Sequence, residues 1–90
     1  GIRSGVDCAK CIALGADVCA IALPLVKRAM QGSEHVETYL EQVIHQLKIA
    51  MFLSASPSVA ALKYAQIVIT GLTSDILARR GYATERFAVR

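Results

Sequence analysis

The sequence lacks the groupings of residues that form most catalytic centres. It contains no Ser/His/Asp arrangement with a recognisable nucleophile elbow, no cluster of metal-ligand residues and no pair of carboxylates in an apolar setting. The only histidines, His35 and His45, lie far from the cysteines along the chain. We therefore assign no catalytic residue and no metal ligand to these 90 residues.

A leader peptide and a membrane-spanning run are also missing. Residues 1–4 do not place an apolar stretch behind a basic start, as a secretory signal does. The longest apolar runs, residues 11–26 and 49–62, are shorter than a membrane span of about 20 residues, and Asp17 interrupts the first. We expect a cytoplasmic protein without membrane contact.

Aromatic residues are few, with two Phe, three Tyr and no Trp. Four of the ten basic residues nevertheless gather in the last twelve positions, at Arg79, Arg80, Arg86 and Arg90. A basic cluster can contact nucleic acid, but single-strand binders interleave such charges with aromatic side chains. We interpret the cluster as a solvated, partly frayed tail and expect no nucleic-acid partner.

Charged residues are scarce at 19%, whereas hydrophobic residues make up 54% of the chain. A chain of this size buries only about 60% of the surface that it exposes when unfolded, so this much apolar material is hard to cover. Either part of it faces a partner, or the chain is a piece of a larger protein. The absence of an initial Met and the abrupt start in a loop favour the second interpretation.

The three cysteines all lie near the start, at Cys8, Cys11 and Cys19. Cys8 and Cys11 have the Cys-x-x-Cys spacing of redox and zinc sites. A structural zinc site needs four ligands, and a thioredoxin-like pair follows a strand, which this chain does not supply before Cys8. We interpret the thiols as small packing residues on a helix.

The first third of the chain is predicted to form a helix, a strand and a second helix. Ser4 is a good N-cap with Asp7 three residues later, and Gly15 suits the end of a helix, which predicts a helix over 5–14. Residues 18–23 are small or β-branched without alternation, which is typical of a strand covered on both faces. Pro24 then begins a short helix that Gly32 stops.

The rest of the chain reads as mostly helical. Apolar residues recur at spacings of three and four over 33–53 and predict one long helix. The expected elements after it are a turn at 54–58, a short helix near 58–64, an extended piece at 67–71, a helix from Thr73 or Ser74 to about Arg80, and a tail over 82–90.

Two loops in this order, Gly1–Ser4 and Ala22–Pro24, would meet at one edge of a parallel sheet. Leu23 has no side-chain acceptor, so the first amides of the following helix have no local cap. An anion would satisfy these amides, although water would as well. Barrels of the (β/α)8 type often hold phosphate with the loops after strands seven and eight and a short extra helix. The sequence therefore predicts a phosphate cradle.

Several stretches resemble a known family. Residues 1–17, in the pattern GIRSGVDxAKxIALGAD, look like the C-terminal barrel segment of FMN-dependent enzymes, including the α-hydroxy-acid oxidases. Cys8 and Cys11 stand where that family usually has small apolar residues. Three further stretches look more like the type 2 isopentenyl-diphosphate isomerases, particularly the archaeal kind. They are AIALPL at 20–25, LKIAMFL at 47–53 and VITG at 68–71, the last with a helix ending at Arg80-Gly81. The similarity extends from residue 1 to about 81.

The resemblance implies an α/β fold, with residues 1–81 as the C-terminal portion, about the last quarter, of a (β/α)8 TIM barrel that is mostly helical in isolation. The whole enzyme would interconvert isopentenyl diphosphate and dimethylallyl diphosphate, using FMN, NADPH and Mg2+, and would form a homo-oligomer (tetramer or octamer). The residues implied in FMN-phosphate binding are Gly1, Ile2, Arg3, Ala22 and Leu23.

The family's substrate-binding histidine, its glutamine near the diphosphate and its magnesium-binding glutamate would all lie upstream of this chain. We therefore expect the 90 residues alone to be inactive. Two alternatives remain open. One is a segment of another FMN barrel enzyme, such as an α-hydroxy-acid oxidase, and the other is a non-enzymatic helical interaction module whose 33–53 face pairs with a second copy.

Overall fold

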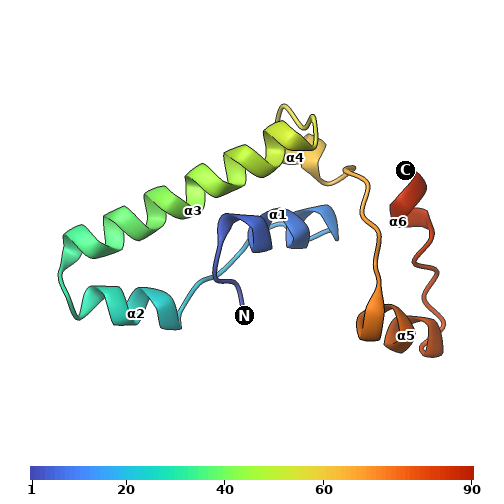
Figure 1. The fold of residues 1–90 in the computed structure, drawn as a ribbon, viewed down its shortest axis with the longest axis horizontal. Helices are drawn as coiled ribbons and strands as arrows, with labels where there is room; N and C mark the ends of the chain where they lie inside the picture. The colour runs from blue at the N-terminus through green and yellow to red at the C-terminus, as the bar shows by residue number, and fades with distance from the viewer.

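The computed structural model describes all of residues 1–90 and contains helices but no strand (Figure 1). The helices are α1 (Gly5–Ala13), α2 (Leu23–Ala29), α3 (Ser33–Leu53), α4 (Val59–Leu62), α5 (Gly71–Arg79) and α6 (Arg86–Val89). None of them is long and apolar enough to cross a membrane. The expectation that the chain is mostly helical is confirmed.

Helix α1 begins where the sequence predicts. The Ser4 hydroxyl accepts a hydrogen bond from the amide of Asp7 at 3.2 Å, which satisfies one of the free donors of the first turn. The chain leaves the helix through Leu14 and then Gly15, whose positive φ of 111° favours glycine. Its predicted range, 5–14, differs from the observed one only at the capping residue.

Helix α3 spans the predicted range 33–53 and is the element on which α1 and α2 pack. Figure 1 shows α1 and α2 along the same side of α3. A small core lies between α1 and α4 at Ala9, Ile12 and Leu62, with Leu47 and Met51 of α3 packed against it. This packing places residues 1–4 and residues 20–24 on the same side of α3.

The predicted strand over 18–23 does not form. Its residues up to Ala22 have no regular structure, and Leu23 already begins α2. A β-strand needs backbone partners on a neighbouring strand, and this chain supplies none. Val18 is 83% exposed, so the covering that the sequence pattern predicts on both faces is also absent within these residues.

The last third differs from the prediction in two places. Helix α5 begins at Gly71 with Thr70 as its N-cap, not at Thr73 or Ser74, and Gly71 has a φ of +67° that favours glycine. The expected tail over 82–90 contains α6, and the amide of Ile67 donates to the carbonyl of Phe87 at 2.8 Å.

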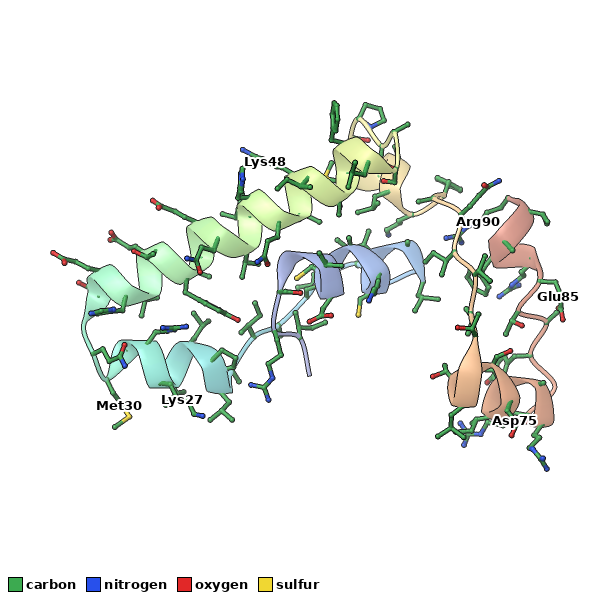
Figure 2. The ribbon with its side chains drawn as sticks, viewed as in Figure 1. Lys27, Met30, Lys48, Asp75, Glu85 and Arg90 are labelled. Carbon is green, nitrogen blue, oxygen red and sulfur yellow. The ribbon has the colours of Figure 1, made fainter.

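Arg90 holds this end of the chain against the earlier segments. Its guanidinium donates to the carbonyl oxygens of Ala65 and Ala13 and lies 4.9 Å from the centre of the Phe87 ring. Figure 2 shows Arg90 beside the extended segment that follows α4. Arg90 is exposed, as expected of a solvated tail, but these contacts show that it is not frayed.

The chain is open and exposes much apolar surface. Its radius of gyration is 15.2 Å, against about 12 Å for a compact domain of this length. Its accessible surface is 6546 Å², against roughly 5,100 Å² for a folded monomer of this mass. Large side chains such as Phe52 and Met30 are 84% exposed. Figure 1 shows α5 set apart from α1–α3. These values fit a segment of a larger protein, in which the rest of the protein covers the apolar faces that are exposed here.

Candidate functional site

The two loops that the sequence marks as a phosphate cradle lie around one pocket of about 220 Å³. All five predicted residues line it: Gly1, Ile2, Arg3, Ala22 and Leu23. Ala20 and Pro24, which the prediction did not include, complete the lining. The loops meet without the sheet that was expected to bring them together, because α1 and α2 both pack on α3.

Both backbone polar groups of Arg3, in the first loop, are hydrogen-bonded. The amide of Arg3 donates to Asp7 Oδ2 at 3.1 Å, and the Tyr39 hydroxyl donates to the carbonyl oxygen of Arg3 at 2.7 Å. The hydrogen bond from the Arg3 amide, with one from Ser4, lowers the pKa of the Asp7 carboxyl below its usual value of 3.8. The Arg3 side chain is in no ion pair, so its charge is available to a ligand.

Gly5 sets the close approach of this loop to α3. A Cβ at Gly5 would lie 2.1 Å from the carbonyl oxygen of Val43 and 2.4 Å from the amide nitrogen of Leu47. The amide of Gly5 donates to Gln46 Oε1 at 2.9 Å. Only glycine permits this contact between the start of α1 and the backbone of α3, and the contact seats residues 1–4 beside the second loop.

The second loop has amides without partners. Ala22 caps α2 with its carbonyl oxygen, which accepts from the amides of Leu25 and Val26, but no side chain caps the helix. The amides of Ala22 and Leu23, and that of Ile2 across the pocket, donate no hydrogen bond within the chain. Three unpaired backbone donors thus belong to residues that line one pocket.

The charge of the pocket is positive. Arg3 carries the only charged side chain among the lining residues, and no acidic residue lines the pocket. Sites that enclose a whole small molecule usually have volumes of roughly 300–1,000 Å³, so about 220 Å³ suits one end of a ligand. Unpaired amides and one arginine bind oxyanions. A phosphate group fits this arrangement in size, charge and donor set.

The three cysteines take no part in the pocket. Cys8 is a buried residue of α1, and the Cys19 thiol donates to the carbonyl oxygen of Cys8 at 3.7 Å. Burial, with a smaller effect of Cys19, raises the pKa of the Cys8 thiol to about 11, whereas a reactive redox cysteine has a lowered pKa. No group of three or more His, Cys, Asp or Glu side chains could hold a metal ion. The structure favours the packing interpretation of the thiols.

The structure adds residues that the sequence analysis did not associate with the site. Tyr39 and Gln46 of α3 hydrogen-bond to the first loop and the start of α1, and the carboxylate of Asp7 accepts a hydrogen bond from the Arg3 amide. Tyr39 lies 36 positions from Arg3 and Gln46 lies 41 positions from Gly5, so no local sequence pattern indicates these contacts. Only the place of Gln46 one turn after the buried Val43 hints that it approaches the packed side of α3.

A pocket that offers backbone amides and an arginine from two successive loops has the donors that suit an anion such as a phosphate group. The model of the family described as FMN-dependent dehydrogenase matches residues 1–69. The chain therefore belongs to the FMN-dependent dehydrogenase family, and the matched residues include both pocket loops.

The similarity to isopentenyl-diphosphate isomerases is also confirmed. The chain is 44% identical over 88 residues to the isopentenyl-diphosphate delta-isomerase of Methanothrix thermoacetophila, which covers 98% of this chain and 25% of the relative. It is 42% identical over 80 residues to the protein of that name from Methanocaldococcus jannaschii, covering 89% and 22%. For the Metallosphaera sedula protein the identity is 43% over 81 residues, covering 90% and 22%. The chain spans about a quarter of the length of these relatives.

Proposed function

We propose that these 90 residues form the C-terminal part of an FMN-dependent isopentenyl-diphosphate delta-isomerase and that their pocket holds the FMN phosphate. The observation that carries the proposal is the convergence of Gly1–Arg3 and Ala22–Leu23 on one pocket with unpaired amides. Family membership supports FMN as the cofactor, and the isomerase relatives support the reaction.

Each of the five predicted residues has a role in this proposal. The amides of Ile2, Ala22 and Leu23 donate to phosphate oxygens, and the Arg3 guanidinium neutralises their charge. Gly1 leaves room, since a Cβ there meets nothing within 4 Å. The bound flavin supplies the redox-active ring system of the reaction, whereas this chain contributes binding and orientation.

The open shape of the chain fits the same proposal. Three of residues 18–22 are exposed and two are half-buried, and none of their amides donates a hydrogen bond, which fits the last strand of a (β/α)8 barrel whose neighbours are missing. In that barrel α3 is the final outer helix and α2 is the short extra helix beside the phosphate. The accessible surface in excess of a compact monomer, roughly 1,400 Å², is then covered by the rest of the barrel.

The remaining parts of the proposed enzyme lie outside these residues. Binding of the isopentenyl diphosphate substrate, of Mg2+ and of NADPH, together with catalysis, belongs to segments upstream of Gly1. The assembly into a tetramer or octamer, drawn from the resemblance, is part of the same proposal, and so is the cytoplasmic location expected from the sequence.

The coding sequence upstream of Gly1 tests the proposal. Expression of the whole reading frame is expected to yield a yellow, FMN-containing protein that converts isopentenyl diphosphate to dimethylallyl diphosphate when the flavin is reduced. An in-frame stop immediately before Gly1 would contradict it. Oxidation of an α-hydroxy acid would favour the oxidase alternative, and a defined oligomer of the 90 residues without affinity for FMN would favour the interaction module.

A further inference from the structure

One side chain of α3 contacts both elements that form the pocket. The Tyr39 hydroxyl donates to the carbonyl oxygen of Arg3 in the first loop, at 2.7 Å. The face of the same ring lies against Arg28 of α2, with the guanidinium carbon 5.6 Å from the ring centre. Tyr39 is half-buried and does not itself line the pocket.

These two contacts constrain the loops in different ways. Because Asp7 already binds the Arg3 amide, the hydrogen bond from Tyr39 to the Arg3 carbonyl fixes the remaining polar group of that residue's backbone. The Arg28 contact ties α2, and with it the Ala22–Leu23 loop at its start, to the same ring. Lys27, the neighbouring cation, projects from the side of α2 that faces away from α3 (Figure 2).

We infer that Tyr39 is the positioning residue of the phosphate pocket, holding the two loops at the separation that a phosphate group requires. This inference rests on the proposed function, because it takes the FMN phosphate as the ligand. Tyr39 acts through the backbone of Arg3 and through α2, and it does not touch the phosphate. Its effect is therefore specific to the phosphate end of the cofactor.

Comparing FMN with riboflavin tests this role, because the two differ only in the phosphate. The protein is expressed with its upstream sequence and stripped of flavin, and the Kd of each flavin is measured from the fluorescence quenching that accompanies binding to this apoprotein. Tyr39→Phe retains the ring and removes the hydroxyl. The Kd for FMN is expected to rise about 3- to 10-fold, the effect of one lost hydrogen bond, with the Kd for riboflavin unchanged.

Matched variants control for other effects. Tyr64→Phe removes the hydroxyl of a tyrosine that is 75% exposed, and it should leave both Kd values unchanged. Arg28→Gln should raise the Kd for FMN about 2- to 5-fold by removing the contact with the ring, whereas Lys27→Gln makes the same charge change without it. Thermal unfolding of each variant measures any general loss of stability.

The outcomes separate the two proposals. A wild-type protein that binds riboflavin as tightly as FMN overturns the phosphate pocket itself and the role of Tyr39 with it. A wild-type protein that prefers FMN, with the same preference in Tyr39→Phe, overturns the role of Tyr39 alone. An equal rise in the Kd values for FMN and riboflavin in Tyr39→Phe also overturns the role of Tyr39, since that result indicates a purely structural residue.

Discussion

Replacing Gly5 with alanine tests the contact that seats the first pocket loop on α3. The added Cβ would lie 2.1 Å from the Val43 carbonyl oxygen and 2.8 Å from Cβ of Gln46. Carbon atoms in favourable contact lie about 3.5–4.0 Å from their neighbours, so the start of α1 must move by on the order of 1 Å. The obstructing atoms include the backbone of α3, which cannot rotate away as a side chain can.

Two opposing effects decide the stability of Gly5→Ala. Alanine is favoured over glycine inside a helix by about 1 kcal/mol, which would stabilise α1. Overpacking costs about 1–3 kcal/mol, and obstruction by backbone atoms puts this site at the upper end. The displacement also lengthens the hydrogen bond from the Gly5 amide to Gln46, now 2.9 Å. We expect a net loss of about 2 kcal/mol in the free energy of unfolding.

Urea denaturation followed by circular dichroism measures this loss, with Gly1→Ala as the control because a Cβ at Gly1 meets nothing within 4 Å. The displaced loop should also weaken FMN binding in the protein expressed with its upstream sequence. If Gly5→Ala were as stable as the wild type, or more stable by the helical preference for alanine, the close approach of α1 to α3 would be refuted.

Three further predictions concern the residues around the pocket. Gln46→Met should lower the free energy of unfolding by about 1 kcal/mol, because the Gly5 amide loses its acceptor, whereas Gln46→Glu retains an acceptor and should cost less in the same urea titration. Asp7→Ala should reduce stability at pH 7. Folding lowers the pKa of the Asp7 carboxyl below 3.8, so the stabilisation by Asp7 is present above that value and is lost as the pH falls through the lowered pKa. The free energies of unfolding of the wild type and Asp7→Ala should therefore converge in acid denaturation. A constant difference between them at low pH would contradict this. Cys8, with a pKa raised to about 11, should stay unmodified by maleimide at pH 7.5 while Cys11 reacts, as mass spectrometry of the peptides will show; faster labelling of Cys8 would contradict its burial.

The helices could be read from the sequence because their signals are local. The apolar spacing over 33–53 and the serine at position 4 specify α3 and the start of α1 through contacts within a few residues. Thr70 at the start of α5 was missed in favour of Thr73 or Ser74. Its side chain makes no capping hydrogen bond, so the residue type alone could not identify it.

The strand over 18–23 was predicted from composition, and it fails because a strand is not a local structure. Small and β-branched residues favour a covered strand, but the backbone bonds must come from neighbouring strands that these 90 residues do not contain. Arg90 was misread for a related reason: its partners, the carbonyl oxygens of Ala13 and Ala65, come from distant parts of the chain.

The sequence by itself determined most of the helices, the family and five of the seven residues that line the candidate pocket, because each depends on short motifs such as those at 1–5 and 20–25. Only the tertiary structure decided that the two loops meet through helices packed on α3 and not through a sheet, that Gly5 permits the approach to α3, and that Tyr39 contacts both loop-bearing elements. Contacts across more than 30 residues depend on how helices pack, and packing is specified by complementary surfaces that no single stretch of sequence contains.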